Sequence, residues 1–130
     1  MPKILVVGDA GVYRDLERIL GERDVEFADT YIWALKISTR SYDNFIIAGW
    51  LPKFENQSPQ PLGVQLAKEI SKKLGLDYEK FRMVSEDYDV LAEAKKIGIK
   101  ELYSKLMADE DQGFKSIYQL LDDLKKDFGL

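Results

Sequence analysis

Short apolar runs alternate along the whole chain with segments in which apolar residues recur every three or four positions. The runs occupy residues 3–7, 25–28, 45–48, 81–85 and 99–103. Each has the length of a strand, and each is apolar throughout rather than at every second position. This is typical of strands of a parallel sheet that is buried on both faces. The pattern predicts five strands, with residues 45–48 in the centre of the sheet.

The intervening segments have the periodicity of amphipathic helices. Asp29 or Thr30 is a candidate cap of the second helix, in which Trp33 is expected to be buried or half-buried. The last helix is expected to follow an acidic stretch at 109–111 and to end near Lys125 and Lys126, which suits the helix dipole. The apolar stripes are Val12, Leu16, Ile19 and Leu20; Ile32, Trp33, Leu35 and Ile37; Leu62, Leu66, Ile70 and Leu74; Leu91, Ala94 and Ile97; and Phe114, Ile117, Leu121, Leu124 and Phe128.

Strands that alternate with helices predict a three-layer α/β/α sandwich around a parallel sheet, formed here by a single domain of residues 1–130. In such a sheet, ligands bind at the carboxyl ends of the strands. The segments 8–11, 48–52, 85–88 and 104–107 lie at these ends and are the candidate functional residues. The loop from Gly49 to Pro61 is long and contains three of the four prolines.

Composition narrows the chemistry. The chain has neither cysteine nor histidine, which excludes disulfides, Cys-His and Ser-His-Asp catalysis, and histidine-based metal sites. The formal net charge of -4 gives no indication of nucleic-acid binding. No apolar run approaches the roughly 20 residues that span a bilayer, and the start does not have the pattern of a signal peptide. We therefore expect a soluble cytoplasmic protein.

Four fragments in sequential order resemble the receiver domains of response regulators. The opening KILVVGD resembles KILVVDD, and YDNFIIAGWLP at 42–52 resembles YDLVLLDxxLP. GVQLAKEI at 63–70 and LAEAKKIGIKELYSK at 91–105 are similar to the family's third helix and to its fourth helix with the following strand. The resemblance covers nearly the whole chain. It implies a CheY-like, flavodoxin-like (βα)5 fold with strand order 2-1-3-4-5.

The family phosphorylates an aspartate after the third strand, with magnesium held by that residue and by two acidic residues after the first strand. A hydroxyl residue after strand four and a lysine after strand five contact the phosphoryl oxygens. The resemblance places these positions at Gly8 and Asp9, at Ala48, and at Ser85 and Lys105. Alanine cannot accept a phosphoryl group, and one carboxylate is a poor magnesium site. The chain is thus expected to be a pseudo-receiver, with no metal and no cofactor.

Each position also has a plainer structural role. Asp9 is either a remnant metal ligand or a helix cap, and Ser85 either a cap or a strand-end hydrogen-bonding group. Lys105 either pairs with Asp9 or is solvated. Trp50 and Phe54 are candidate lid residues over the vacant site, and the alternative is that Trp50 packs on the loop with Phe54. Leu106 replaces the proline that usually follows the lysine, so its peptide bond is expected to be trans. Leu102 takes the place of the family's aromatic switch residue, with Tyr103 facing the opposite side of the sheet.

The resemblance implies a non-enzymatic signalling domain that binds a protein partner without phosphorylation. Receivers commonly use the face of helix four, strand five and helix five for partners or for homodimers. In this chain that face would present lysines and tyrosines: Tyr88, Lys95, Lys96, Lys100, Tyr103, Lys115 and Tyr118. The alternative is a flavodoxin-like cofactor-binding or enzymatic domain, for which the glycines of residues 8–11 are a weak phosphate-binding signal. Phosphorylation at an unusual residue such as Ser85 is a third possibility.

Overall fold

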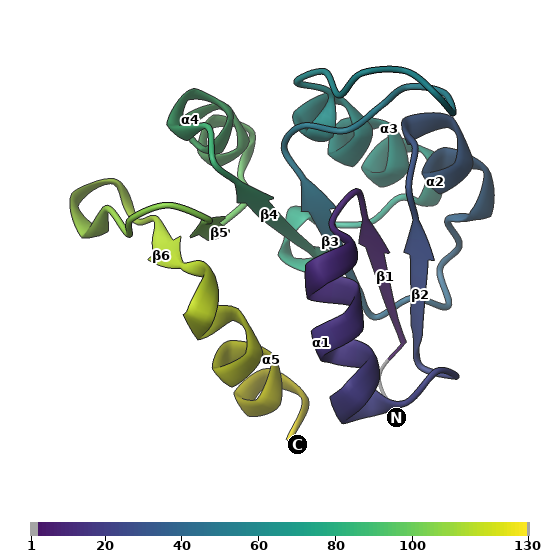
Figure 1. Cartoon of the computed structure of the whole chain (residues 1–130), viewed down its shortest axis with the longest axis horizontal. Helices are drawn as coiled ribbons and strands as arrows, with labels where there is room; N and C mark the ends of the chain where they lie inside the picture. Colours follow the sequence, from purple (N-terminus) through teal and green to yellow (C-terminus); the bar gives the residue numbers. More distant parts are fainter. Residues whose placement is uncertain (1–2, 130) are drawn as a thin grey trace.

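A six-stranded parallel sheet runs through the centre of the protein (Figure 1). The computed structural model describes residues 3–129. The strand order is β2-β1-β3-β4-β5-β6, and every neighbouring pair is parallel. The strands are β1 (Ile4–Val7), β2 (Val25–Ala28), β3 (Asn44–Ala48), β4 (Phe81–Ser85), β5 (Glu101–Ser104) and β6 (Lys115–Ser116). The predicted α/β fold is confirmed, with one short strand added at the edge.

Helices cover both faces of the sheet. The α-helices are α1 (Ala10–Leu20), α2 (Tyr31–Ile37), α3 (Gly63–Leu74), α4 (Tyr88–Ile97) and α5 (Leu120–Phe128). Three short 3-10 turns are η1 (Tyr78–Lys80), η2 (Glu110–Gln112) and η3 (Ile117–Gln119). In Figure 1, α1 and α5 lie on the near face, and α2, α3 and α4 lie on the other. No helix within residues 3–129 is long and apolar enough to cross a membrane.

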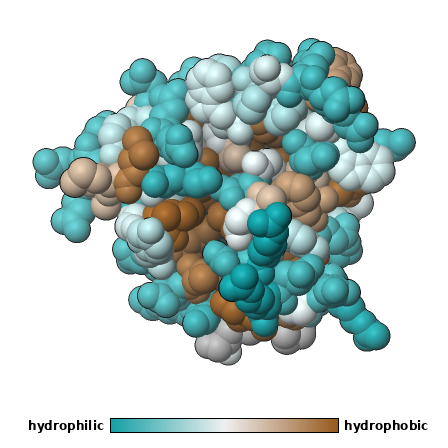
Figure 2. Space-filling view, in the orientation of Figure 1, coloured by the Kyte–Doolittle hydropathy of each residue, from teal (hydrophilic) through white to brown (hydrophobic). Residues whose placement is uncertain are grey.

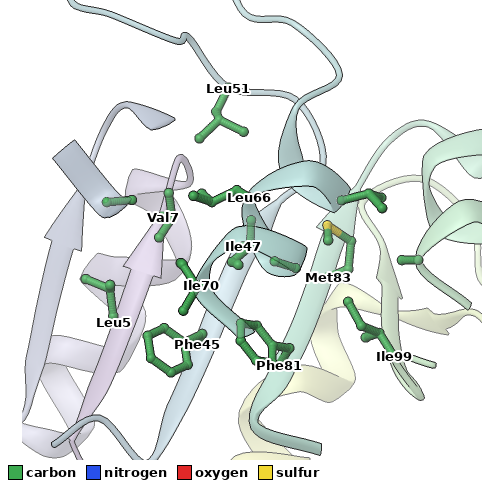
Figure 3. Close-up of a cluster of buried hydrophobic side chains, with 14 of the residues drawn as sticks. Leu5, Val7, Phe45, Ile47, Leu51, Leu66, Ile70, Phe81, Met83 and Ile99 are labelled. Carbon is green, nitrogen blue, oxygen red and sulfur yellow. The ribbon is translucent and has the colours of Figure 1, made fainter. Parts of the chain in front are cut away.

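Because side chains alternate along each strand, the sheet divides the core into two clusters. Leu5, Phe45 and Met83 face α2, α3 and α4 (Figure 3), whereas Ile4, Ile46 and Val84 face α1 and α5. The rings of Phe45 and Phe81 stack in the larger cluster, with centroids 5.0 Å apart. Figure 2 shows hydrophobic residues gathered between α1 and α5 on the near face, with hydrophilic residues around them.

The last helix is shorter than its sequence pattern predicts. It begins at Leu120 rather than near Phe114. The acidic stretch at 109–111 supplies the N-cap and the first two residues of η2, and Gly113, with φ +81°, is the C-cap of η2. Phe114 lies in the α2–α4 cluster, whereas Leu120 lies in the α1–α5 cluster. One helix cannot bury its stripe on both faces of a sheet, so the chain crosses the sheet edge as β6 before α5 begins. Strand β5 likewise begins at Glu101, two residues later than predicted.

One aromatic residue of α2 and the long loop beside it add to the pattern expected from the sequence. Trp33 of α2 is 46% exposed, so it lies outside the core and about half of its surface is covered; Lys36 lies over its ring, 5.6 Å from the centroid. The long loop is closed by a bridge between Leu51 and Gln60 and packs against the start of α2. Pro52 and Lys53 accept hydrogen bonds from the first amides of that helix through their carbonyls. The loop thereby satisfies N–H groups that a helix terminus leaves without partners.

Candidate functional site

A cavity of about 500 Å³ opens at the carboxyl ends of β1, β3, β4 and β5. It brings together residues that are far apart in the sequence, as the parallel topology requires. All five residues of the predicted degenerate site line it. The lining residues are Gly8, Asp9, Ala48, Trp50, Pro59, Val84, Ser85, Glu86, Asp87 and Lys105.

The resemblance matched Gly8 to the family's first acidic residue, and the backbone at Gly8 is unsuited to a carboxylate side chain. Its φ is +80°, a left-handed backbone conformation that residues other than glycine rarely adopt. A Cβ at Gly8 would also lie 3.0 Å from the Cβ of Ala48 and 3.1 Å from that of Leu51. The backbone conformation of Gly8 and these close neighbours therefore leave little room for a longer side chain at the end of β1.

Asp9 fulfils two of the roles weighed for it. One carboxylate oxygen accepts a hydrogen bond of 3.1 Å from the amide of Val12 and caps α1. The other lies 3.0 Å from the ammonium of Lys105. The Asp9 side chain is 8% exposed and that of Lys105 is 40% exposed. The ion pair joins the ends of β1 and β5 across the cavity, and the Lys105–Leu106 peptide is trans, as expected.

Replacing Lys105 by methionine is expected to lower the free energy of unfolding by about 1 kcal/mol, because the nearly buried Asp9 carboxylate loses its cation. The expected loss of unfolding free energy is small because the Lys105 ammonium is partly solvated, which weakens the ion pair. Urea denaturation measures it, and Lys100→Met, at an exposed lysine, is the control. Equal stability of Lys105→Met and the control would show that the ion pair contributes nothing.

Backbone and small side chains surround Ala48, which the resemblance matched to the phosphoryl acceptor. Ala48 is 8% exposed, and the amide of Gly63 donates to the carbonyl of Gly49 over 3.0 Å. A Cβ at Gly49 would lie 2.7 Å from Ser85 Oγ. Ser85 ends β4, and its Oγ accepts a hydrogen bond of 3.0 Å from the amide of Asp87. It is thus the strand-end hydrogen-bonding group, while Asp87 caps α4.

Trp50 closes one side of the cavity. Its indole N–H donates a 2.9 Å hydrogen bond to the carboxylate of Asp87, so the loop after β3 is tied to the loop after β4. The indole lines the cavity and is 45% exposed. Phe54, which was paired with it as a possible lid, does not line the cavity; it lies further along the loop, 47% exposed, under the ammonium of Lys53.

The predicted interaction face contains one error. Tyr103 is fully buried and cannot contact a partner. Its side chain lies in the α1–α5 cluster, on the side of the sheet opposite to that of Leu102. Tyr118 is 88% exposed, and Lys95, Lys96 and Lys100 are exposed. Lys95 donates to the carbonyl of Gln112, and the Tyr88 hydroxyl donates to that of Met107. A second cavity of about 260 Å³ lies beside Lys95, Lys100 and Leu102.

A buried polar network joins the sheet to α5, and sequence patterns did not predict it. Arg82 of β4, with a side chain 4% exposed, binds Asn44, Tyr103, Glu101 and Asp127. The members of the network come from four strands and a helix, so their proximity appears only in the fold. The one sequence signal for the network was Arg82 itself, a charged residue within the otherwise apolar run 81–85. The further contacts are Tyr103 to Asp123, 2.7 Å, and Lys115 to Asp123, 2.9 Å, and to Glu101, 3.1 Å.

The network shifts the ionisation of its members. Burial raises the pKa of the Tyr103 hydroxyl, and the hydrogen bond to Asp123 raises it further. Burial opposes the ionised form of Asp123, but hydrogen bonds from Tyr103 and Lys115 hold the pKa of that carboxyl below its usual value. Burial also opposes the charge of Arg82, yet its hydrogen bond with Asp127 and nearby anionic groups raise the pKa of the guanidinium. The network thus favours the ionised form of Asp123.

The lowered pKa of Asp123 predicts acid sensitivity. A carboxyl with a depressed pKa contributes stability above its unfolded pKa of about 3.9, and this contribution is lost as pH falls through the folded value. The free energy of unfolding is expected to fall more steeply below about pH 4 in the native chain than in Asp123→Asn. Urea titrations at several pH values measure the slopes. Asp122→Asn, at an exposed residue of the same helix, is expected to retain the native slope.

These elements and this sheet order define the fold of response-regulator receiver domains. The non-phosphorylated HemR receiver domain from Leptospira biflexa superimposes with a TM-score of 0.67 at 22% identity, covering 100% of this chain and 96% of that one. A CheY-like receiver domain from Methanospirillum hungatei gives 0.61 at 18%, covering 98% and 93%. The response regulator TrrA from Thermotoga maritima, in complex with Mg²⁺ and BeF, gives 0.56 at 21%, covering 97% and 98%. No protein-family model and no curated protein matches the sequence.

Proposed function

We propose that the protein is a pseudo-receiver, a signalling domain that acts through protein contacts without being phosphorylated. The observation that carries the proposal is the content of the cavity at the strand ends. Ala48 occupies the acceptor position, Gly8 holds a conformation unfavourable to a carboxylate, and Lys105 is paired with Asp9. The lysine that would contact a phosphoryl group is already neutralised within the fold. A cytoplasmic location and a role without catalysis accompany this proposal.

The surface proposed for partner binding is the α4–β5–β6 face, defined here as Tyr88, Lys95, Lys100 and Tyr118. Exposed lysines beside a tyrosine suit the rim of a protein interface. The second cavity on this face gives a partner side chain a place to insert, with Leu102 at its apolar wall. A second copy of the chain is one candidate partner, which would form a homodimer.

Affinity capture from the source cell tests the proposal. The full chain is compared with a face variant, Lys100→Glu with Tyr118→Ser, and with a control on α2, Lys36→Glu with Trp33→Ser. Capture is repeated with magnesium and acetyl phosphate. We expect the face variant to lose partners that the control keeps, whether or not the phosphodonor is present. Capture that depends on the phosphodonor, or that the α2 variant abolishes equally, would contradict the proposal. Sedimentation of the purified chain shows whether the partner is a second copy.

A further inference from the structure

The cavity at the strand ends carries an excess of negative charge. Three carboxylates line it, from Asp9, Glu86 and Asp87, against one ammonium, from Lys105. Three negative charges and one positive charge leave a formal charge of two negative units. The N-termini of α1 and α4 lie at this edge and contribute about half a positive charge each, so the site remains negative by about one unit. An anion would enter this cavity against repulsion.

The carboxylates differ in how far they are already neutralised. Asp9 is paired with Lys105, and Asp87 accepts hydrogen bonds from Trp50 and from the first amides of α4. Glu86 is exposed, and within residues 3–129 it forms no ion pair or side-chain hydrogen bond. The carboxylate of Glu86 is therefore the charge at the rim that remains free for a ligand.

The rest of the lining is apolar and aromatic. Ala48 and Pro59 contribute apolar surface, and the indole of Trp50 is held in place by its hydrogen bond to Asp87. A cation within about 6 Å of an indole ring is attracted by the ring electrons. The volume of about 500 Å³ is in the range of small-ligand pockets. Aromatic surface beside a free carboxylate suits a cation that also has an apolar part.

We propose that this cavity binds an organic cation, a guanidinium or primary ammonium group on a short apolar stem. A bare divalent ion fits less well, because no group of three or more side chains in residues 3–129 is arranged to hold a metal, and such ions require several oxygen ligands. The cation stacks on Trp50 and faces Glu86, while the stem contacts Pro59. The cavity has this character whether or not the α4–β5–β6 face binds a protein, so the two proposals can fail separately.

The chain supplies its own reporter. It has two tryptophans, Trp33 and Trp50, so an amide correlation spectrum shows two indole N–H signals, which Trp33→Phe assigns. Trp33 lies on α2 and does not line the cavity. The full chain is titrated with n-butylguanidinium, with the neutral isostere n-butylurea, and with pentanoate. We expect only the guanidinium to shift the Trp50 signal saturably, with a dissociation constant on the order of 1 mM for so small a ligand, and to leave Trp33 unchanged.

Glu86→Gln is expected to weaken binding about two- to fivefold, as removal of one exposed ionic contact should. Glu93→Gln, at an exposed residue outside the cavity, should leave it unchanged. Absence of a saturable Trp50 shift, equal binding of pentanoate or butylurea, or an unaltered constant in Glu86→Gln would each overturn the proposal. A titration with N-acetyl-arginine N-methylamide, compared with that of butylguanidinium, identifies the source of the cation. Tighter binding than butylguanidinium points to an arginine side chain of a partner protein, and weaker binding points to a free small molecule.

Discussion

Gly63→Ala is expected to lower the free energy of unfolding by about 3 kcal/mol. A Cβ on Gly63 would lie 2.4 Å from the carbonyl oxygen of Ala48 and 2.7 Å from the Cα of Gly49. Both contacts are with backbone, so relief requires α3 to move away from β3, and overpacking of this kind costs up to a few kcal/mol. The same movement would break the 3.0 Å hydrogen bond from the Gly63 amide to Gly49. Urea denaturation followed by tryptophan fluorescence measures the loss.

Gly11→Ala is the matched control for this substitution. Gly11 lies in the first turn of α1, is exposed, and has no backbone atom near its would-be Cβ. Alanine is the better helix former, so the change in stability should stay within about 0.5 kcal/mol or favour the variant. A cost below about 1 kcal/mol for Gly63→Ala would show that α3 can shift freely, and the tight packing described around Ala48 would be wrong.

Arg82→Met is expected to cost about 3 kcal/mol of unfolding free energy. The guanidinium is buried, and its removal leaves Glu101 without one of its cations and deprives Asp127, Asn44 and Tyr103 of a donor. Removing one member of a buried ionic group costs more than the group's net contribution, because the remaining polar atoms stay desolvated. The methionine side chain ends at about the position of the Arg82 Nε, so the expected loss combines the missing hydrogen bonds with a small cavity at the guanidinium. Denaturation in urea is again the measurement.

Arg18→Met provides the comparison for Arg82→Met. The Arg18 side chain is 77% exposed and lies 3.8 Å from Asp15 on the same helix. Such pairs contribute little, so a change within about 0.5 kcal/mol is expected. If the two arginine variants were equally stable, the network would not stabilise the packing of α5 on the sheet. It would then only provide hydrogen-bond partners for the buried polar groups.

Periodicity predicted most of the fold because the signals were local. Residues 25–28 and 81–85 coincide with β2 and β4, and Gly75 and Gly98 end α3 and α4 in the left-handed conformation, as such glycines do. Periodicity failed at Phe114. The helical spacing of apolar residues continues from Phe114 into α5, but Phe114 and α5 pack on opposite faces of the sheet. The pairing of β6 with β5 is a contact between distant segments, and a helical pattern carries no information about it.

The sequence likewise predicted some features of the candidate site and not others. The topology itself brings Asp9, Ala48, Ser85 and Lys105 to one cavity, since the carboxyl ends of parallel strands meet at one edge. The ion pair of Asp9 with Lys105 was one of two open alternatives, because side-chain geometry decides it. The hydrogen bond of Trp50 to Asp87 joins loops 37 residues apart and had no sequence signal. Tyr103 was misplaced because strand alternation shows that two residues face opposite sides, but not which side is solvent.

Intact-mass analysis after incubation with magnesium and acetyl phosphate tests the pseudo-receiver proposal most directly. A beryllofluoride titration followed by the fluorescence of Trp50 in Trp33→Phe accompanies it, because this indole lines the cavity. We expect no phosphoryl mass gain and no fluorescence change under conditions that phosphorylate a receiver with an intact acceptor aspartate. A phosphoryl adduct at any residue, Ser85 included, would contradict the proposal that this domain signals without phosphorylation.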